Sequence, residues 1–390
     1  VFGVLRILGI AVVVLAVSVT SVAGLAVWNT ISSIKPGIHL AHVRGTNEPI
    51  PQVGSIDGAV NLLLAGTDTR SGQGGFQDRA DLAGSSGAGN NDVTMLLHIS
   101  ADHQHATVVS IPRDLLVSIP ACPRSNGGVT PPTSQAMFNT TLSRGGLSCT
   151  VLATEKLTGL DIQYAAEISF DGVIGMSNAV GGVAVCLATP INDDYVGLDL
   201  PAGEQTIEGA QALAFLRSRH GVGDGSDLGR ISDQQLFMSA LMRKISSAGV
   251  LSNPLTLYSL ANAALKNMQL SDTLTAPTTM VAIAVALKGI SLNNIVFVQY
   301  PTQGDPAAPG RVIGEQRADS VLTAALDADQ PLQLSGKLGR ATVADPAAPT
   351  GATTPGPTPT GTAAPDGVAL PADVTGQTAA QQTCAEGYKP

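Results

Sequence analysis

The N-terminal segment constrains this chain most, because residues 7–28 form an apolar run that contains no charged residue. A helix of about 20 apolar residues crosses the hydrocarbon core of a bilayer. Arg6 precedes the run, and Trp28 ends it where aromatic side chains favour the membrane interface. We therefore expect residues 1–28 to form a cytoplasmic end and a single-pass transmembrane helix. A cleaved signal peptide is the alternative, although its apolar region is normally only about 7–15 residues long.

Both interpretations export the rest of the chain, and export changes what the four cysteines imply. Cysteines in an oxidising compartment form disulfides, and four cysteines allow three pairings. None of them shows the C-x-x-C spacing that would indicate a zinc site. Cys122 and Cys149 are the most local pair and are expected to bond, which leaves Cys186 to pair with Cys384. Buried free thiols are the alternative.

Composition divides the exported part of the chain. Residues 29–57 are polar and punctuated by proline and glycine, as expected of a stalk, and residues 58–340 form the folded domain. Residues 341–383 are rich in Ala, Pro, Thr and Gly, so they are predicted to be a disordered tail that cannot bury enough apolar surface to fold. The end of the chain, residues 384–390, would be tethered to the body through Cys384.

The pattern of the folded domain indicates an α/β fold. Short apolar segments typical of strands occur at residues 59–65, 92–100, 106–112 and 295–300. Apolar residues at helical spacing occur between them, as at residues 228–245. This alternation predicts a single layered α/β domain with a central mixed sheet flanked by helices.

The acidic charge balance excludes one class of function. The formal net charge is −9, whereas a general nucleic-acid binder needs a basic surface that releases counterions. We therefore expect no nucleic-acid partner, and any anion site must be local. Arginine outnumbers lysine, and Ala, Gly, Val and Thr are abundant, which indicates a GC-rich bacterial source.

Charged side chains stand at the ends of the predicted strands. Asp68 and Arg70 follow the first strand, Asp92 begins the second, and Arg113 follows the third. Ligand sites of open α/β sheets gather at the carboxyl ends of strands. Asp68 and Asp92 together would suit Mg²⁺, which takes one or two carboxylates plus water and phosphate oxygens. Taken separately, each aspartate is an ordinary turn or capping residue.

Two arginines at positions i and i+2 are the sharpest local signal. Arg217 and Arg219 would point apart on a helix, but they share one face of an extended segment. Two guanidinium groups on one face make a multidentate site suited to phosphate. Arg230 and Gln234 follow on one face of the next helix, which Asp227 can cap. The alternative is a solvated surface with scattered arginines.

Six segments, taken in order behind the apolar N-terminus, resemble the LytR–CpsA–Psr family. They read NLLLAGTDTR, NDVTMLLHIS, VVSIPRD, FNTTLSRGG, GGVAVCL, and ALAFLRSRH followed by DLGRISDQQ. The resemblance covers residues 58–247. It implies an α/β domain with an apolar groove for a polyprenyl chain, and a phosphotransferase activity. Such an enzyme moves a glycopolymer, phosphate included, from a polyprenyl-pyrophosphate carrier to peptidoglycan.

The resemblance also implies roles for individual residues. Asp68 and Asp92 match aspartates that bind Mg²⁺ in the family. The positions that match pyrophosphate contacts are Arg70, Arg113, Arg217, Arg219, Arg230 and Gln234. The residues expected to take part directly in catalysis are Arg113, Arg217, Arg219 and Asp92. Asp92 or Asp114 is the candidate to take the proton of the attacking hydroxyl group.

The implied partners are a polyprenyl-pyrophosphate-linked glycopolymer, a peptidoglycan acceptor and the cell membrane, with the catalytic domain outside the cytoplasm. An arabinogalactan or another actinobacterial wall glycan fits the indicated source, and teichoic acid and capsule are alternatives. Two other functions stay open. One is a pyrophosphatase, which uses water as the acceptor, and the other is a regulatory protein that binds polyprenyl phosphates without turnover.

The sequence departs from the family pattern at two positions. A lysine is frequent two residues before the position of Asn139, where this chain has Met137, and Arg144 is a candidate substitute. Asp233 stands where an arginine is frequent, and we expect this change to affect a structural ion pair. The apolar helical segments within residues 253–287 are expected either to line the lipid groove or to form plain core.

Overall fold

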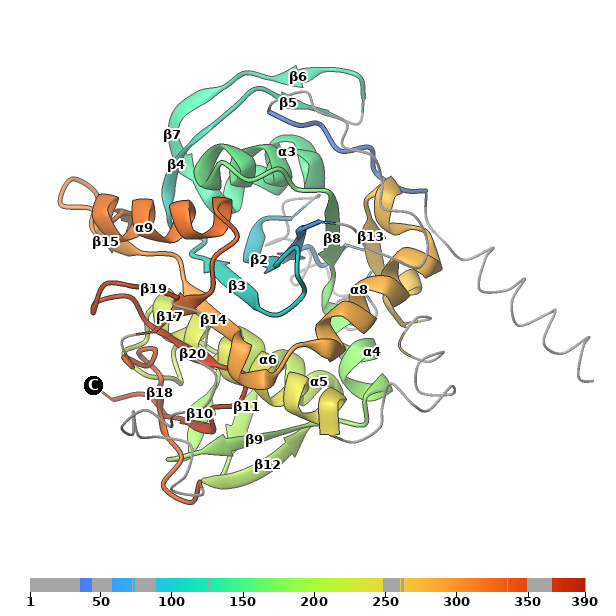
Figure 1. Cartoon of the computed structure of the whole chain (residues 1–390). Coiled ribbons are helices and arrows are strands. Elements are labelled where there is room, and N and C mark those ends of the chain that lie inside the picture. Colours follow the sequence, from blue (N-terminus) through green and yellow to red (C-terminus); the bar gives the residue numbers. More distant parts are fainter. Residues whose placement is uncertain are drawn as a thin grey trace, which may run out of the picture.

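A seven-stranded mixed sheet forms the centre of the molecule (Figure 1). The computed structural model describes residues 36–43, 58–71, 73, 89–124, 126–247, 260, 263–334, 336–348 and 367–389. In spatial order the strands are β13 (Met268–Leu270), β8 (Tyr164–Ile168), β1 (Val60–Thr67), β2 (Asn91–Ile99), β3 (Ala106–Ile111), β14 (Ile295–Gln299) and β20 (Gly376–Thr378). β8 runs parallel to β1 and β14 runs parallel to β3, while the other neighbours are antiparallel. The predicted mixed sheet is therefore confirmed.

A second sheet has four strands, and the other described strands form two-stranded ribbons. The second sheet consists of β12 (Gly203–Ile207), β9 (Val183–Leu187), β21 (Thr383–Ala385) and β18 (Thr342–Ala344). The ribbons pair β4 (Leu116–Ile119) with β7 (Thr133–Met137), β5 (Cys122–Pro123) with β6 (Val129–Thr130), β10 (Ile191–Asp193) with β11 (Leu198–Leu200), β15 (Thr302–Gly304) with β16 (Val312–Gly314), and β17 (Leu332–Gln333) with β19 (Val368–Ala369).

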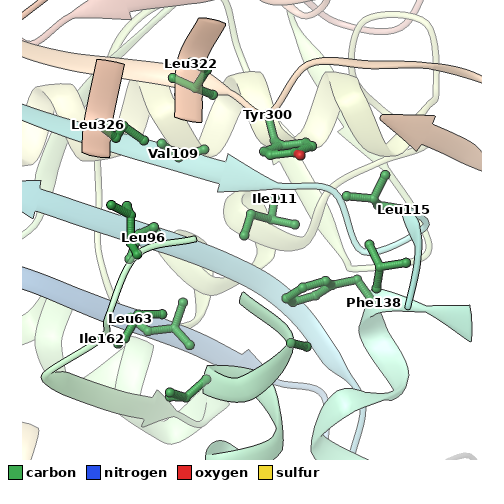
Figure 2. Packing of buried hydrophobic residues seen from close by; sticks show 14 of the residues in the cluster. Leu63, Leu96, Val109, Ile111, Leu115, Phe138, Ile162, Tyr300, Leu322 and Leu326 are labelled. Carbon is green, nitrogen blue, oxygen red and sulfur yellow. The ribbon is translucent and has the colours of Figure 1, made fainter. Parts of the chain in front are cut away.

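Helices cover both faces of the central sheet (Figure 1). One face carries α3 (Thr141–Thr158) and α9 (Gln316–Asp327), and the other carries α4 (Phe170–Ala179), α5 (Gly209–Arg217), α6 (Asp227–Ser247) and α8 (Pro277–Gly289). Successive side chains of a strand point to opposite faces, so Leu63 of β1 joins one core and Leu62 and Leu64 join the other. Figure 2 shows the first core, where Leu322 and Leu326 of α9 pack with residues of the strands.

Glycines set the usable length of α3. Gly145 and Gly146 interrupt the helix with non-helical backbone angles, so its regular part begins at Leu147. Gly159 ends the helix in the left-handed conformation, at φ 78°, which glycine adopts without steric cost. The regular helix therefore runs from Leu147 and stops at Gly159.

Both predicted disulfides are present. Cys122 of β5 is bonded to Cys149 of α3, and Cys186 of β9 is bonded to Cys384 of β21. The second bond joins two adjacent parallel strands of the second sheet. It therefore fixes the C-terminal segment against the body of the domain.

The prediction of a disordered tail over residues 341–383 is wrong for the part that the structure describes. β18 and β21 belong to the second sheet, and β20 is an edge strand of the central sheet. Leu370, Val374 and Ala379 are buried. These strands are each three residues long and add to existing sheets, so they need little apolar content of their own. Residues 349–366 lie outside the described residues.

Part of the predicted stalk belongs to the folded domain. Leu40 is buried in the core beside α3, and the backbone N–H of Val43 donates to the carboxylate of Glu155 at 2.8 Å. In the part of the chain that the structure describes, no helix combines the length and apolar character needed to span a membrane. The anchor predicted over residues 1–28 lies outside that part.

Candidate functional site

A cavity of about 440 Å³ lies between the central sheet and helices α4, α5 and α6. Apolar side chains form much of its wall, among them Met95, Ile168, Val173 and Met238. Six of the predicted site residues also line it, namely Asp92, Arg113, Arg217, Arg219, Arg230 and Gln234. Along α6 the lining changes from Arg230 and Gln234 to Phe237, Leu241 and Ile245. The charged groups therefore gather at the end of the cavity where α6 begins.

Arg217 and Arg219 reach the same cavity because α5 ends between them. Arg217 is the last residue of the helix, and Ser218 turns the chain into an extended conformation at φ −57° and ψ 131°. Ser218 is fully buried and does not line the cavity, and its hydroxyl donates to Asp193 at 2.8 Å. Both arginines therefore face one cavity, although Arg217 belongs to a helix and not to the expected extended segment.

Two of the four arginines at this end are held by carboxylates. Nη1 of Arg113 lies 2.9 Å from Oδ1 of Asp92, and its Nε lies 3.5 Å from Asp227. Nη2 of Arg230 lies 2.6 Å from Asp227 and donates to the carbonyl oxygen of Asp92 at 2.7 Å. Burial alone would lower the pKa of Arg113, but Asp92, Asp227 and Asp114 together raise it. Arg113 and Arg230 are therefore fixed in position before any ligand binds.

A β-bulge places Asp92 between these arginines. Gly66 of β1 pairs with Val93 of β2, but the next residue, Thr67, pairs with Asn91, so Asp92 is the extra residue. A bulge changes the direction of a side chain at the end of a ladder and is common beside active sites. This irregularity turns Asp92 into the cavity, where it meets Arg113 and Arg230.

Arg217 and Arg219 carry charge that the described residues do not neutralise. No carboxylate oxygen of the described residues lies within 4.0 Å of either guanidinium group. Arg217 stacks over the ring of Phe170 at 4.4 Å, and Nε of Arg219 donates to the carbonyl oxygen of Gly225 at 3.2 Å. Burial lowers the pKa of Arg217, and the positive charge of Arg70 adds to this effect. An anion entering the cavity would relieve that cost.

Asp68 and Arg70, the two other predicted site residues, do not line the cavity. The carboxylate of Asp68 accepts hydrogen bonds from the backbone and the side chain of Asn90, which joins the ends of β1 and β2. Both residues are close enough to act on the pKa of Arg217, which Arg70 lowers and Asp68 raises. They therefore lie beside the arginine end rather than within its wall.

The cavity wall also contains polar residues that the sequence did not indicate, among them Asp193, Tyr195 and His220. Asp193 is buried and accepts hydrogen bonds from the backbone N–H groups of Arg219 and Gly221, each at 3.1 Å. The Asp193–Arg219 contact joins residues 26 positions apart. No local pattern signals a contact over such a separation.

The departures from the family pattern have physical outcomes. Arg144 does not replace the frequent lysine, because it is absent from the cavity wall and its guanidinium group donates to the carbonyl oxygen of Pro131 at 2.7 Å. Asp233, at the second departure, forms no ion pair with the described residues, and its buried carboxylate has no hydrogen-bond partner among them. Burial raises the pKa of Asp233 well above its ordinary value.

The apolar segments predicted within residues 253–287 contribute little to the cavity. Leu260 and Met268 line it, whereas Ile283 of α8 is buried in the core against the central sheet. Residues 251–259 lie outside the described residues. The groove interpretation is therefore wrong for α8, and helices α4, α5 and α6 supply the apolar wall instead.

The LytR_cpsA_psr family model matches residues 33–327. The chain belongs to this family. The cell wall biosynthesis protein LcpA of Corynebacterium glutamicum is 29% identical over 308 residues, which cover 74% of this chain and 58% of LcpA. The polyisoprenyl-teichoic acid–peptidoglycan teichoic acid transferase TagU of Oceanobacillus iheyensis is 28% identical over 225 residues, which cover 57% of this chain and 63% of TagU. The matches therefore span less than two thirds of the length of either relative.

A solved structure agrees with the family assignment. The LytR-Csp2A-Psr enzyme from Actinomyces oris superimposes with a TM-score of 0.53 at 21% sequence identity, covering 75% of this chain and 96% of that chain. At this identity the likeness shows the fold alone. It confirms that the mixed sheet with helices on both faces is the fold of this family.

Proposed function

We propose that this protein transfers a glycopolymer, together with its phosphate, from a polyprenyl-pyrophosphate carrier to peptidoglycan. One observation carries the proposal, namely that a single cavity joins an apolar wall to four arginines. A carrier of this kind has the same two parts, a hydrocarbon chain and a pyrophosphate. The name of TagU supports both the linked polymer and the peptidoglycan acceptor.

The apolar wall suits the polyprenyl chain. Phe237, Leu241 and Ile245 follow one another along α6 at helical spacing and line the cavity beyond the arginines. Each CH₂ group that leaves water contributes about 0.8 kcal/mol. The carrier would therefore lie along α6, with its pyrophosphate at the N-terminal end of that helix.

The four arginines would have two different roles in binding the pyrophosphate. Arg113 and Arg230 are fixed by Asp92 and Asp227 and give the site its shape. Arg217 and Arg219 hold the charge that a phosphate oxygen can pair with, in the forked geometry that suits phosphate. A pyrophosphate would therefore bind chiefly through Arg217 and Arg219, with Gln234 as a further donor.

Catalysis would rest on positioning and on stabilisation of charge. The acceptor hydroxyl attacks the phosphorus that carries the glycopolymer, and the bond from that phosphorus to the bridging oxygen breaks. Polyprenyl phosphate leaves, and Arg217 and Arg219 stabilise the negative charge that develops on the phosphate oxygens. Asp92 lines the cavity and would take the hydroxyl proton, whereas Asp114 is outside the wall and bound to Arg311 at 2.8 Å.

Mg²⁺ would be held by the carboxylates at the two strand ends. Asp68 and Asp92 supply the hard oxygen ligands that Mg²⁺ takes, one or two at a time, with the remainder from water and phosphate. The backbone N–H of Asp68 donates to the carbonyl oxygen of Asn90 at 3.1 Å, which keeps the two strand ends together. When bound, the ion would neutralise charge on the phosphate oxygens.

The location outside the cytoplasm is part of the proposal. Two disulfides support an oxidising compartment. The apolar run at residues 7–28 supports attachment to the membrane that holds the lipid carrier.

The test is a transfer reaction with the full chain. The substrates are a radiolabelled polyprenyl-pyrophosphate glycopolymer and nascent peptidoglycan, with Mg²⁺ present. Arg217→Ala should lower kcat/KM about 100-fold or more, as expected for loss of one group that stabilises the transition state. Arg217→Lys should recover part of the rate because it keeps the charge but not the fork. Arg317→Ala is the matched control, since Arg317 is exposed on α9, on the opposite face of the sheet.

Three results would contradict the proposal. Release of free phosphate without attachment of the polymer would indicate a pyrophosphatase. Tight binding of the lipid without either product would indicate a regulatory binding protein. An Arg217→Ala enzyme as active as Arg317→Ala would show that the arginine cavity is not the reaction site.

A further inference from the structure

An exposed aromatic side chain stands at the arginine end of the cavity. Tyr195 lies in the turn between β10 and β11, and it is 81% exposed. The ring of His220 lies beside it, with 4.4 Å between the ring centroids and 38° between the planes. Both residues line the cavity, and His220 directly follows Arg219. The pair therefore forms an aromatic surface next to the residue proposed to hold phosphate.

This exposure is unusual for the chain. Aromatic residues make up only 3% of the sequence, so few are available to pack the core. Tyr164 and Tyr300 are each 1% exposed or less, as expected for residues that contribute large apolar areas to a core. The exposed Tyr195 ring contributes no such burial to the stability of the fold. A ligand that covers the ring would account for its exposure.

Asp193 fixes the aromatic surface relative to the arginines. Its Oδ1 accepts the backbone N–H of Tyr195 at 3.1 Å, and its Oδ2 accepts the backbone N–H of Arg219 at 3.1 Å. One buried carboxylate therefore holds both the turn that carries Tyr195 and the segment that carries Arg219 and His220. The surface has a built position beside the phosphate site and does not depend on a ligand to order it.

The position of this surface determines what it can bind. The apolar wall along α6 leads away from the arginines in one direction, and that direction takes the hydrocarbon chain of the carrier. The other end of the pyrophosphate carries a sugar. A sugar ring has an apolar face of C–H groups that packs on an aromatic ring, while its hydroxyls meet the polar tips of tyrosine and histidine.

We propose that Tyr195 and His220 form a platform for a sugar ring next to the pyrophosphate. The inference rests on the proposed transferase function and deepens it by assigning a carbohydrate subsite. The sugar can come from either of two sources, the first residue of the transferred glycopolymer or the acceptor glycan of peptidoglycan. The two sources share the same chemistry and are separated by experiment.

The first experiment measures binding to the full chain with two synthetic lipids. One is geranylgeranyl pyrophosphate, and the other carries N-acetylglucosamine on its terminal phosphate. The wild-type protein should bind the glycosylated lipid more tightly than the sugar-free lipid. Tyr195→Ala should lower the affinity for the glycosylated lipid about fivefold, as expected for loss of one stacked ring. Affinity for the sugar-free lipid should stay within about twofold, because the arginines are untouched. Tyr195→Phe should keep most of the preference for the glycosylated lipid, because the substitution keeps the aromatic ring.

Tyr388→Ala is the matched control. Tyr388 is also exposed, at 52%, and its side chain packs near Gly225 in the loop that follows Arg219, outside the cavity wall. A disturbance of that loop would weaken the binding of both lipids in Tyr388→Ala and Tyr195→Ala alike. A loss confined to the glycosylated lipid and to Tyr195→Ala therefore identifies contact with the sugar of the glycopolymer.

The second experiment addresses the acceptor. If the sugar comes from peptidoglycan, Tyr195→Ala binds both lipids as the wild type does, but its KM for soluble glycan strands rises about fivefold at unchanged kcat. An equal loss for both lipids, or no change in either experiment, overturns the platform. Those outcomes leave the transferase proposal standing as long as Arg217→Ala abolishes binding of the sugar-free lipid. Failure of the wild type to bind that lipid would overturn the transferase proposal itself.

Discussion

Removal of the Asp193 carboxylate should loosen the arginine end of the cavity. Its two oxygens accept hydrogen bonds from the Ser218 hydroxyl and from the backbone N–H groups of Tyr195, Arg219 and Gly221. A buried donor without an acceptor costs about 1–3 kcal/mol. The donors of Ser218 and Gly221 are buried. Asp193→Ala should therefore lower the free energy of unfolding by about 2–6 kcal/mol.

Urea denaturation of the full chain, followed by far-ultraviolet circular dichroism, measures this loss. Asp193→Asn keeps one acceptor oxygen and should lose only about 1 kcal/mol. Asp199→Ala is the matched control, because Asp199 is exposed on β11 of the same hairpin, and it should change stability by less than about 0.5 kcal/mol. Equal urea midpoints for Asp193→Ala and Asp199→Ala would refute the reasoning.

The pH dependence provides an independent check on Asp193. Burial alone would raise its pKa, but the hydrogen bonds from Ser218, Gly221 and Arg219 hold the pKa below the ordinary value. The ionised carboxylate therefore stabilises the fold above about pH 4, and this stability is lost as the pH falls through the lower folded-state value. The stability difference between the wild type and Asp193→Asn should shrink between pH 7 and pH 3. A constant difference would contradict the assigned hydrogen bonds.

Two further predictions concern stability. Burial raises the pKa of Asp233 well above its ordinary value, so its ionised form opposes folding at neutral pH and above. Asp233→Asn should therefore be more stable than the wild type by at least about 1 kcal/mol at pH 8, and this gain should vanish below about pH 4. Urea denaturation at both pH values measures the gain, and a gain of the same size at both would contradict the prediction. Removal of the Cys186–Cys384 bond, which joins residues 198 apart, should cost about 5 kcal/mol by chain entropy. Removal of Cys122–Cys149, which joins residues 27 apart, should cost about 3.5 kcal/mol. Urea denaturation of the two Cys→Ala double variants measures both losses, and a larger loss for the Cys122–Cys149 variant would contradict the entropic argument.

The central sheet was predictable because its strands are local apolar runs. β1, β2, β3 and β14 each coincide with a segment that the sequence marks as a buried strand. The C-terminal strands were not predictable in the same way. β20 and β21 are each three residues long and gain their stability from neighbours that precede them by many residues. The average composition of residues 341–383 indicates a segment that cannot fold alone. It contains no information about the sheet edges, formed by earlier strands, to which these residues add.

The site shows the same division between local and distant information. The spacing of Arg217 and Arg219 predicted a shared face on an extended segment. The structure brings both side chains to one cavity because α5 ends between them. The residue types also indicated that Arg113 and Arg230 belong to the site. They did not indicate that both arginines form ion pairs with aspartates. That state depends on a bulge that turns Asp92 inward and on the meeting of β2, α6 and the segment after β3. Because two arginines are neutralised in this way and two are not, the site can be rigid and still carry the charge that an anion requires.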